Sequence, residues 1–205
     1  MKAISLTQGT VAYVDDEDYD RISAKSWAIH PQGAGYAVRK GNRSLGEPRT
    51  VEMHREILYA SRGTIIDHIN GNSLDNRKCN LRYCDTQKNA FNRKKPRGEC
   101  TSRYKGVLRR KDAPSWTARI KYCDRHIELG TFSTEEIAAA AYNLAAAVFF
   151  GDFRRENIID DSIRLSVADT EKVMSRCHRA IINRGLNVQT ERYMDYLASM
   201  QRLAS

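Results

Sequence analysis

The sequence predicts an α+β protein built from several small units. Short apolar alternations recur in the first 60 residues and again between residues 104 and 132, and such alternation is typical of short strands. Alanine-rich and amphipathic stretches after residue 133 favour helices. Clusters of asparagine, aspartate and glycine within these stretches indicate tight turns.

The first 60 residues are expected to form a small β-rich unit. Strand candidates lie around residues 3–14, 27–30 and 36–38, with a hairpin loop at 31–35 and an acidic turn or helix at 15–20. Residues 51–59 begin like a strand and become helix-like near His54. A lone histidine such as His54 is more often a structural or phosphate-side residue than a catalyst.

Composition indicates a soluble protein with a polyanionic partner. The 205 residues are 41% hydrophobic and 29% charged, with a net charge of +9. No apolar run approaches the ~20 residues of a membrane span, and the N-terminus lacks the apolar core of a signal peptide. Five cysteines without a CxxC pair predict reduced thiols and a cytoplasmic protein; a zinc site using Cys79, Cys84 and Cys100 is a minor alternative.

The positive charge is concentrated in the middle of the chain. Between Asn76 and Arg125 there are 16 lysines and arginines against 4 aspartates and glutamates, so the remainder of the chain carries a small negative balance. A run of charge is usually a solvated face. This run, however, is too concentrated to be ignored, and a basic stretch of this kind favours a polyanion such as nucleic acid as the partner.

Residues 64–93 have the clearest local pattern. Thr64–Ile66 favours a strand, the asparagines and aspartates of residues 70–76 favour turns, and residues 81–83 favour a second short strand. Asp85 or Thr86 can cap a following helix. The order strand, loop, strand, helix places Asp67 and His68 at the end of the first strand and Asn89 on the first turn of the helix.

These residue types suit hydrolysis of a phosphodiester. Water must lose a proton to a base that is partly neutral near pH 7, and histidine has a free pKa of ~6.5. A hard divalent cation neutralises charge on the phosphate and prefers oxygen ligands such as the Asp67 carboxylate and the Asn89 amide. Asn80 could position the imidazole of His68 and fix its tautomer.

The stretch DHINGNSLDNRKCNLRYCDTQKNAFNR resembles the motif of HNH homing endonucleases in its H-N-N variant. The spacing fits, with Asn80 twelve residues after His68 and Asn89 nine residues later. The resemblance implies a ββα-metal fold with one Mg²⁺ or Mn²⁺. It assigns His68 as general base, Asp67 and Asn89 as metal ligands, and Asn80 as the residue that holds the loop and orients His68.

A basic segment then leads to a second unit. Residues 92–100 contain four cations, a proline and a glycine, which fits a domain boundary that also touches phosphates, or simply a solvated linker. Between residues 102 and 132, three short antiparallel strands are expected, with turns at 112–114 and 124. Alternation places Trp116, Ala118 and Ile120 on one face and Thr117, Arg119 and Lys121 on the other. A capping box at Ser133–Glu136 begins a helix that Gly151 ends.

This second unit resembles AP2/ERF-type DNA-binding domains. The matching segments are YKGV, the W-x-A-x-I strand, LGTF, the helix TEEIAAAAYNLAAAVFFG and Asn157; Leu108 and Glu128 depart from the plant proteins. The resemblance implies that the sheet enters the major groove of DNA. The DNA-contact candidates are Lys105, Arg110, Arg119, Lys121 and His126, together with Arg93, Lys94 and Lys95 of the basic segment.

The predicted organisation is therefore a β-rich unit (1–60), a nuclease core (61–95), a linker (96–101), an AP2-like domain (102–157) and a helical extension (158–205). Helices are expected at 170–183 and 190–204; packing is their default role, and DNA contact or homodimerisation are the alternatives. The predicted function is a metal-dependent endonuclease of homing or nicking type acting on double-stranded DNA, in a phage or mobile element. An inactive DNA-binding regulator and an RNA-binding protein are the competing hypotheses.

Overall fold

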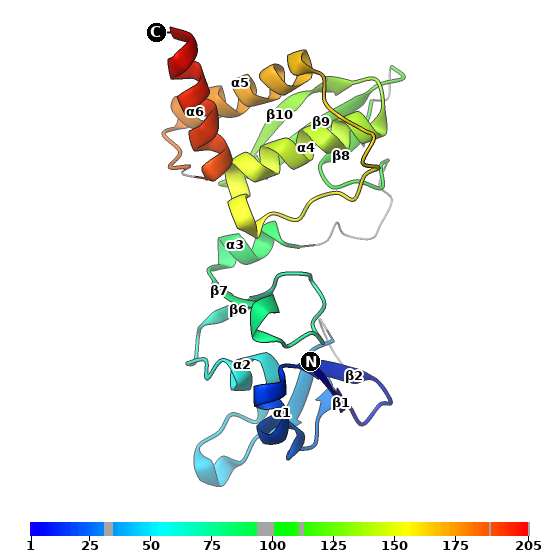
Figure 1. Cartoon of the computed structure of the whole chain (residues 1–205), viewed down its shortest axis with the longest axis vertical. Helices are drawn as coiled ribbons and strands as arrows, with labels where there is room; N and C mark the ends of the chain where they lie inside the picture. The colour runs from blue at the N-terminus through cyan, green and yellow to red at the C-terminus, as the bar shows by residue number, and fades with distance from the viewer. Residues whose placement is uncertain (31–34, 94–100, 111–112, 189, 205) are drawn as a thin grey trace. The chain divides into compact units, whose positions relative to one another are not determined.

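The computed structural model describes residues 1–30, 35–93, 101–110, 113–188 and 190–204 (Figure 1). The chain forms two compact units, Met1–Asn92 and Arg93–Ser205. Both contain helices and small antiparallel sheets, so the predicted α+β class is confirmed at that level. The finer domain boundaries stay predictions. Among the helices of the described ranges, none combines the length and the apolar character needed to span a bilayer.

In its described residues, the first unit contains three small sheets and three α-helices. The sheets are β1 (Lys2–Ser5) with β2 (Val11–Val14); β3 (Ala28–Ile29), β4 (Ala37–Lys40) and β5 (Thr50–Glu52) in that order; and β6 (Ile65–His68) with β7 (Leu81–Cys84). The helices are α1 (Asp16–Ser23), α2 (Met53–Ile57) and α3 (Thr86–Phe91). Single 3₁₀ turns lie at η1 (Arg43–Leu45) and η2 (Lys78–Asn80). The strand and helix positions expected from the sequence are confirmed, including the change from strand to helix beside His54, while residues 31–34 of the expected hairpin loop lie outside the described residues.

One apolar core runs through the whole first unit. It joins side chains of the N-terminal strands, such as Ile4 and Val14, to Trp27 and Met53 and to Ile66 and Leu81 of the β6–β7 pair. The Trp27 indole is 1% exposed and donates a hydrogen bond to the Ile22 carbonyl at 2.8 Å. The β6–β7 pair is therefore supported by the same core as the β-rich segment that precedes it.

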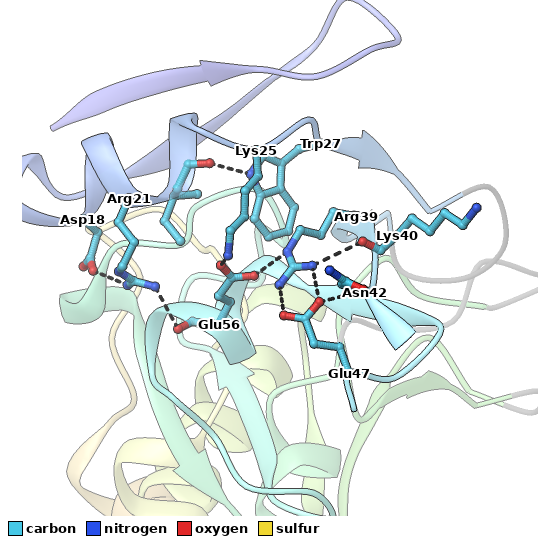
Figure 2. Close-up of polar contacts among 10 residues, drawn as sticks. Asp18, Arg21, Lys25, Trp27, Arg39, Lys40, Asn42, Glu47 and Glu56 are labelled. Carbon is cyan, nitrogen blue, oxygen red and sulfur yellow. Dashed lines mark hydrogen bonds and ion pairs between the residues drawn. The ribbon is translucent and has the colours of Figure 1, made fainter. Parts of the chain in front are cut away.

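A network of charged side chains ties α2 to β4 in this unit. Figure 2 shows the Arg39 guanidinium between two carboxylates, with Nε 2.6 Å from Glu56 and its terminal nitrogens 2.7 and 2.8 Å from Glu47. Lys25 also pairs with Glu56. The side chains of Arg39 and Glu56 are only 9% and 10% exposed, so each charge depends on its partner for stabilisation.

Glu56→Ala is expected to lower the free energy of unfolding of the first unit by about 3 kcal/mol, because it leaves the buried Arg39 guanidinium with one carboxylate fewer. Urea unfolding, followed by the fluorescence of Trp27 in a Trp116→Phe background, measures the loss. Glu17→Ala is the matched control, since Glu17 forms an exposed ion pair with Lys78 that should contribute nothing measurable. Equal losses for the two variants would contradict the role given to the network.

The second unit consists of a three-stranded sheet, a helix across it and two further helices. The sheet has the order β10-β9-β8, with β8 (Val107–Arg109), β9 (Trp116–Tyr122) and β10 (Arg125–Phe132) all antiparallel. Helix α4 (Glu135–Phe150) packs on this sheet, and η3 (Gly151–Phe153) follows it. Helices α5 (Val167–Arg184) and α6 (Glu191–Ala204) complete the unit (Figure 1).

The side chains of β9 face as the alternation predicts. Ala118 and Ile120 are buried beneath α4, whereas Arg119 and Lys121 are exposed on the opposite face. The Thr134 hydroxyl caps α4 by accepting from the backbone N–H of Ile137 at 3.2 Å. The helix therefore starts within the expected stretch, but its N-cap is Thr134, so the expected pairing of Ser133 with Glu136 in a capping box is wrong. Of the turn expected at 112–114, residue 112 lies outside the described part of the chain.

Gly106 of the YKGV segment is fixed by close packing. Its φ is +74°, and a Cβ atom built there would lie 2.1 Å from the Tyr142 ring of α4 and 2.5 Å from the Arg119 carbonyl oxygen. No side chain fits such a space, and positive φ favours glycine in any case. This residue lets β8 approach both the helix and the neighbouring strand.

Candidate active site

The candidate site lies at the end of β6, where the chain leaves the β6–β7 pair. The antiparallel register places Asp67 opposite Arg82 and His68 opposite Leu81. The loop between the strands begins with a tight turn, in which the Gly71 N–H donates to the His68 carbonyl at 2.8 Å. Gly71 has a φ of +67°, which a glycine adopts without strain.

The His68 imidazole is buried and neutral. His68 is 5% exposed. This burial, together with the neighbouring His54, lowers the pKa of His68 to about 4. Nε2 lies 3.3 Å from the Asn76 amide oxygen. Hydrogen bonding to that oxygen requires the proton on Nε2, which leaves the lone pair on Nδ1 free to accept a proton.

Asn76 is held in place by the N-terminal hairpin. The residue is 1% exposed, and its backbone N–H donates to the Tyr13 carbonyl at 2.8 Å. Tyr13 in turn donates its N–H to the Leu74 carbonyl, so β2 makes a parallel bridge with the loop. The first strands of the chain thereby fix the position of the side chain that contacts His68.

Asn80 braces the same loop from inside. Its amide oxygen accepts from the backbone N–H of Asn70 at 3.0 Å, and its amide nitrogen donates to the Asp75 carbonyl at 2.7 Å. Both bonds go to the loop backbone. The side-chain contact to His68 comes from Asn76.

Asp67 is a buried carboxylate with two neighbouring donors. Arg82 donates to Oδ2 at 2.9 Å from Nε and 2.7 Å from Nη2. The Asn92 amide nitrogen lies 3.0 and 3.1 Å from the two carboxylate oxygens, and it also donates to the His68 carbonyl at 2.9 Å. Asn92 is the C-cap residue of α3, so these contacts join the end of α3 to the end of β6.

The residues at this position fit a hard divalent cation. Asn89 is half-buried and lies three residues before Asn92, on helix α3, which adjoins β6. Carboxylate and amide oxygens such as those of Asp67 and Asn89 are the donors that Mg²⁺ or Mn²⁺ prefers, and these two residues would be the ligands expected from the sequence. In the described ranges, no three His, Cys, Asp or Glu side chains cluster as a metal site. The alternative zinc site depends on Cys100, which lies outside those ranges.

Two further rings surround the His68 imidazole. The Tyr36 ring is stacked at 5.7 Å between centroids, and the His54 ring meets His68 edge-on at 5.1 Å. His54 is 4% exposed, with Nε2 3.3 Å from the Glu52 carboxylate. Its buried Nδ1 has no hydrogen-bond partner among the described residues. The imidazole of His68 is thus held between ring contacts and the amide of Asn76.

The DNA-contact candidates of the second unit differ in exposure. Arg119, Lys121 and His126 are exposed, and Lys121 and His126 are paired across β9 and β10 on one face of the sheet. Arg110 is exposed after β8, as is Arg93. Lys105 is half-buried; burial and the nearby Arg155 lower its pKa to about 8, and its ammonium donates to the Arg93 carbonyl at 3.0 Å. Lys94 and Lys95 lie outside the described residues.

Sequence reasoning missed four side chains of the site. Asn76, Arg82 and Asn92 all lie inside the motif stretch, where the segments LDNR, NLR and AFNR were available as signals. Tyr36 carried no signal, because it lies just before β4, far from the motif in the sequence.

Comparison with known proteins assigns the family. No protein-family model matches the chain. An uncharacterized HNH endonuclease of Acanthamoeba polyphaga mimivirus is 32% identical over 159 residues, which is 75% of this chain and 78% of the relative. Together with the Asp67–His68 pair at the end of β6, this similarity shows that the chain belongs to the HNH endonuclease family.

Proposed function

We propose that this chain is a metal-dependent HNH endonuclease, of homing or nicking type, that hydrolyses phosphodiester bonds in double-stranded DNA. The observation that carries the proposal is the buried, neutral His68 imidazole at the end of β6, directly after Asp67, whose carboxylate Asn92 contacts from the end of α3. A neutral imidazole can accept a proton from water, and the carboxylate supplies an oxygen ligand beside it.

His68 acts as the general base. Its Nδ1 lone pair accepts the proton of the attacking water, while Nε2 remains bonded to Asn76. Asp67 and Asn89 would hold one Mg²⁺ or Mn²⁺. The bound cation supplies charge neutralisation for the phosphate and for the departing 3′ oxygen.

The remaining residues position the base. Asn76 fixes which imidazole nitrogen carries the proton. Asn80 stabilises the loop that contains Asn76 through two hydrogen bonds to its backbone. The rings of Tyr36 and His54 limit rotation of the imidazole. Because the imidazole of His68 is already oriented in this way, it does not have to reorient during the reaction step.

The second unit brings the substrate to this site. An AP2-like sheet would dock in the major groove with Arg110, Arg119, Lys121 and His126, each base-reading arginine contributing ~1–3 kcal/mol of discrimination. The Lys105 ammonium donates to the Arg93 carbonyl and has further N–H donors that could contact phosphate. Arg93, Lys94 and Lys95 would add phosphate contacts, which position the duplex without reading its sequence.

A catalytically inactive DNA-binding regulator is the second candidate. The ion pair between Asp67 and Arg82 favours it, because a carboxylate already neutralised by a guanidinium is a weaker cation ligand. Cleavage that requires Mg²⁺ or Mn²⁺ would exclude this candidate.

The substrate class and the product ends test the proposal. End-labelled duplex DNA, single-stranded DNA and RNA of one sequence are incubated with the protein and Mg²⁺ or Mn²⁺, using DNA from the region that flanks the gene. Duplex cleavage should dominate and leave 5′-phosphate and 3′-hydroxyl ends. Preferential RNA cleavage, or products with 3′-phosphate ends, would contradict it.

A further inference from the structure

Helix α5 carries a row of polar side chains, three of them cations, along one side. Lys172, Arg176, Arg179 and Asn183 recur at spacings of three or four residues, which places them on one stripe of the helix. The adjoining arc of α5 is buried and includes Val173, Cys177 and Ile181, which pack into the second unit. The stripe of polar side chains therefore lies at the border between the packed face and the surface.

This stripe runs beside the edge strand of the sheet. The Lys172 ammonium lies 5.4 Å from the centre of the Phe132 ring, near the end of β10. The Arg176 guanidinium donates to the Glu128 carbonyl at 3.1 Å and lies 3.7 Å from its carboxylate. Helix α5 thus runs antiparallel to β10, which has β9 on one side only.

An open groove of about 300 Å³ lies between the helix and the strand. Its polar lining comprises Arg176, Arg179, Asn183 and Arg184 of α5, with His126 and Glu128 of β10. Glu128 is the one acidic residue of this lining. Arg179 and Arg184 are exposed and form no ion pair within the described part of the chain, so two guanidinium groups are available to an anion.

The groove adjoins the face of the sheet that carries exposed cations. His126 lines the groove and is paired with Lys121 across the sheet, and Glu128 is paired with Arg119. Paired residues on neighbouring antiparallel strands lie on the same face. His126 therefore belongs both to the groove and to the cationic face of β9 and β10.

We propose that this groove of α5 binds phosphates of the DNA backbone and makes the helix a second DNA-contacting element beside the sheet. The span from Lys172 to Arg184 is about 18 Å at 1.5 Å per residue, which is about five base steps at 3.4 Å each. Guanidinium groups bind phosphate oxygens in pairs of hydrogen bonds, and such contacts anchor the duplex without reading its sequence. The proposal depends on DNA being the substrate.

The test is the salt dependence of duplex binding. Fluorescence anisotropy measures the dissociation constant over a range of salt concentrations for the unaltered chain, Arg179→Gln, Arg184→Gln and the double variant. Each lost phosphate contact should reduce the slope of log affinity against log salt by about 0.9, and the double variant by about twice that. The loss should be equal for cognate and unrelated duplexes.

Two further variants make the result specific. Arg192→Gln removes an exposed arginine of α6 that lies outside the groove and should leave the slope unchanged. Arg119→Gln alters the sheet. If the double variant keeps the full slope while Arg119→Gln reduces it, the groove does not bind DNA and the proposed function stands. If the unaltered chain shows no salt-dependent duplex binding, DNA as the substrate fails as well.

Discussion

The His68→Ala variant is expected to lose DNA cleavage by at least about 100-fold, and by up to ~10⁴-fold, while its affinity for duplex DNA stays close to that of the unaltered chain. The imidazole is buried and neutral, so its removal takes away a proton acceptor and no cation that could bind phosphate. A fall in kcat with little change in KM is the signature of an interaction made only in the transition state. Single-turnover experiments measure the cleavage rate, and fluorescence anisotropy measures the affinity for the same duplex.

The control for this variant is His178→Ala. His178 lies in α5, bonded to the Tyr193 hydroxyl at 3.0 Å, and takes no part in the proposed chemistry. Added imidazole should restore part of the activity of His68→Ala, because the substitution leaves a cavity of the right size beside Asn76. Cleavage by His68→Ala at the rate of the unaltered chain would show that another group is the base.

Asn76→Ala is expected to lower the cleavage rate by about 10- to 100-fold, the usual cost of removing a partner that orients a site histidine. The amide oxygen 3.3 Å from Nε2 selects the tautomer with its lone pair on Nδ1, and alanine cannot make that selection. Asn76→Asp keeps an acceptor oxygen at the same place and should retain more activity than Asn76→Ala. The effect should fall on kcat, and nitrogen NMR of the imidazole should show mixed tautomers in the alanine variant.

Asn72→Ala is the matched control for Asn76. It removes the same type of side chain from the same loop, but Asn72 is exposed and its amide oxygen accepts from the nearby Leu74 N–H. Equal rates for Asn76→Ala and Asn72→Ala, with both proteins folded, would contradict the orienting role of Asn76. Equal activities for Asn76→Asp and Asn76→Ala would show that Asn76 has only a structural role in the loop.

Much of the fold could be predicted because its elements are local. Apolar alternation located the strands of both units, and capping residues located the starts of α3 and α4. The expected helix at 170–183 begins earlier, since Ser166 caps α5 at Val167. The apolar periodicity of the sequence did not reveal this earlier start, because Ser166 lies before the first residue of the periodic pattern.

The site could be predicted only in part, since some of its contacts come from distant segments. Asp67 and His68 are adjacent in the sequence, and their strand was evident. The contact between Asn76 and His68 depends on a loop that β2 holds through Tyr13, and no local pattern reports such a bridge. The ion pair of Asp67 with Arg82 depends on the register of β6 and β7, because a shift of one residue would move the two side chains to opposite faces.

The second unit shows the same division between local and tertiary information. The exposed face with Arg119 and Lys121 follows from strand alternation alone. The half-burial of Lys105 does not, because it depends on how the residues around Asn157 pack against the start of β8: Asn157 accepts the Lys105 N–H at 2.7 Å.

Cleavage of supercoiled plasmid DNA that carries the region flanking the gene tests the central claim most directly. The unaltered chain should convert the plasmid to nicked or linear DNA with Mg²⁺ or Mn²⁺, and EDTA or the Asp67→Asn substitution should prevent the conversion. Intact plasmid under all conditions, from a protein that binds the same DNA, would contradict the nuclease assignment and favour the regulator.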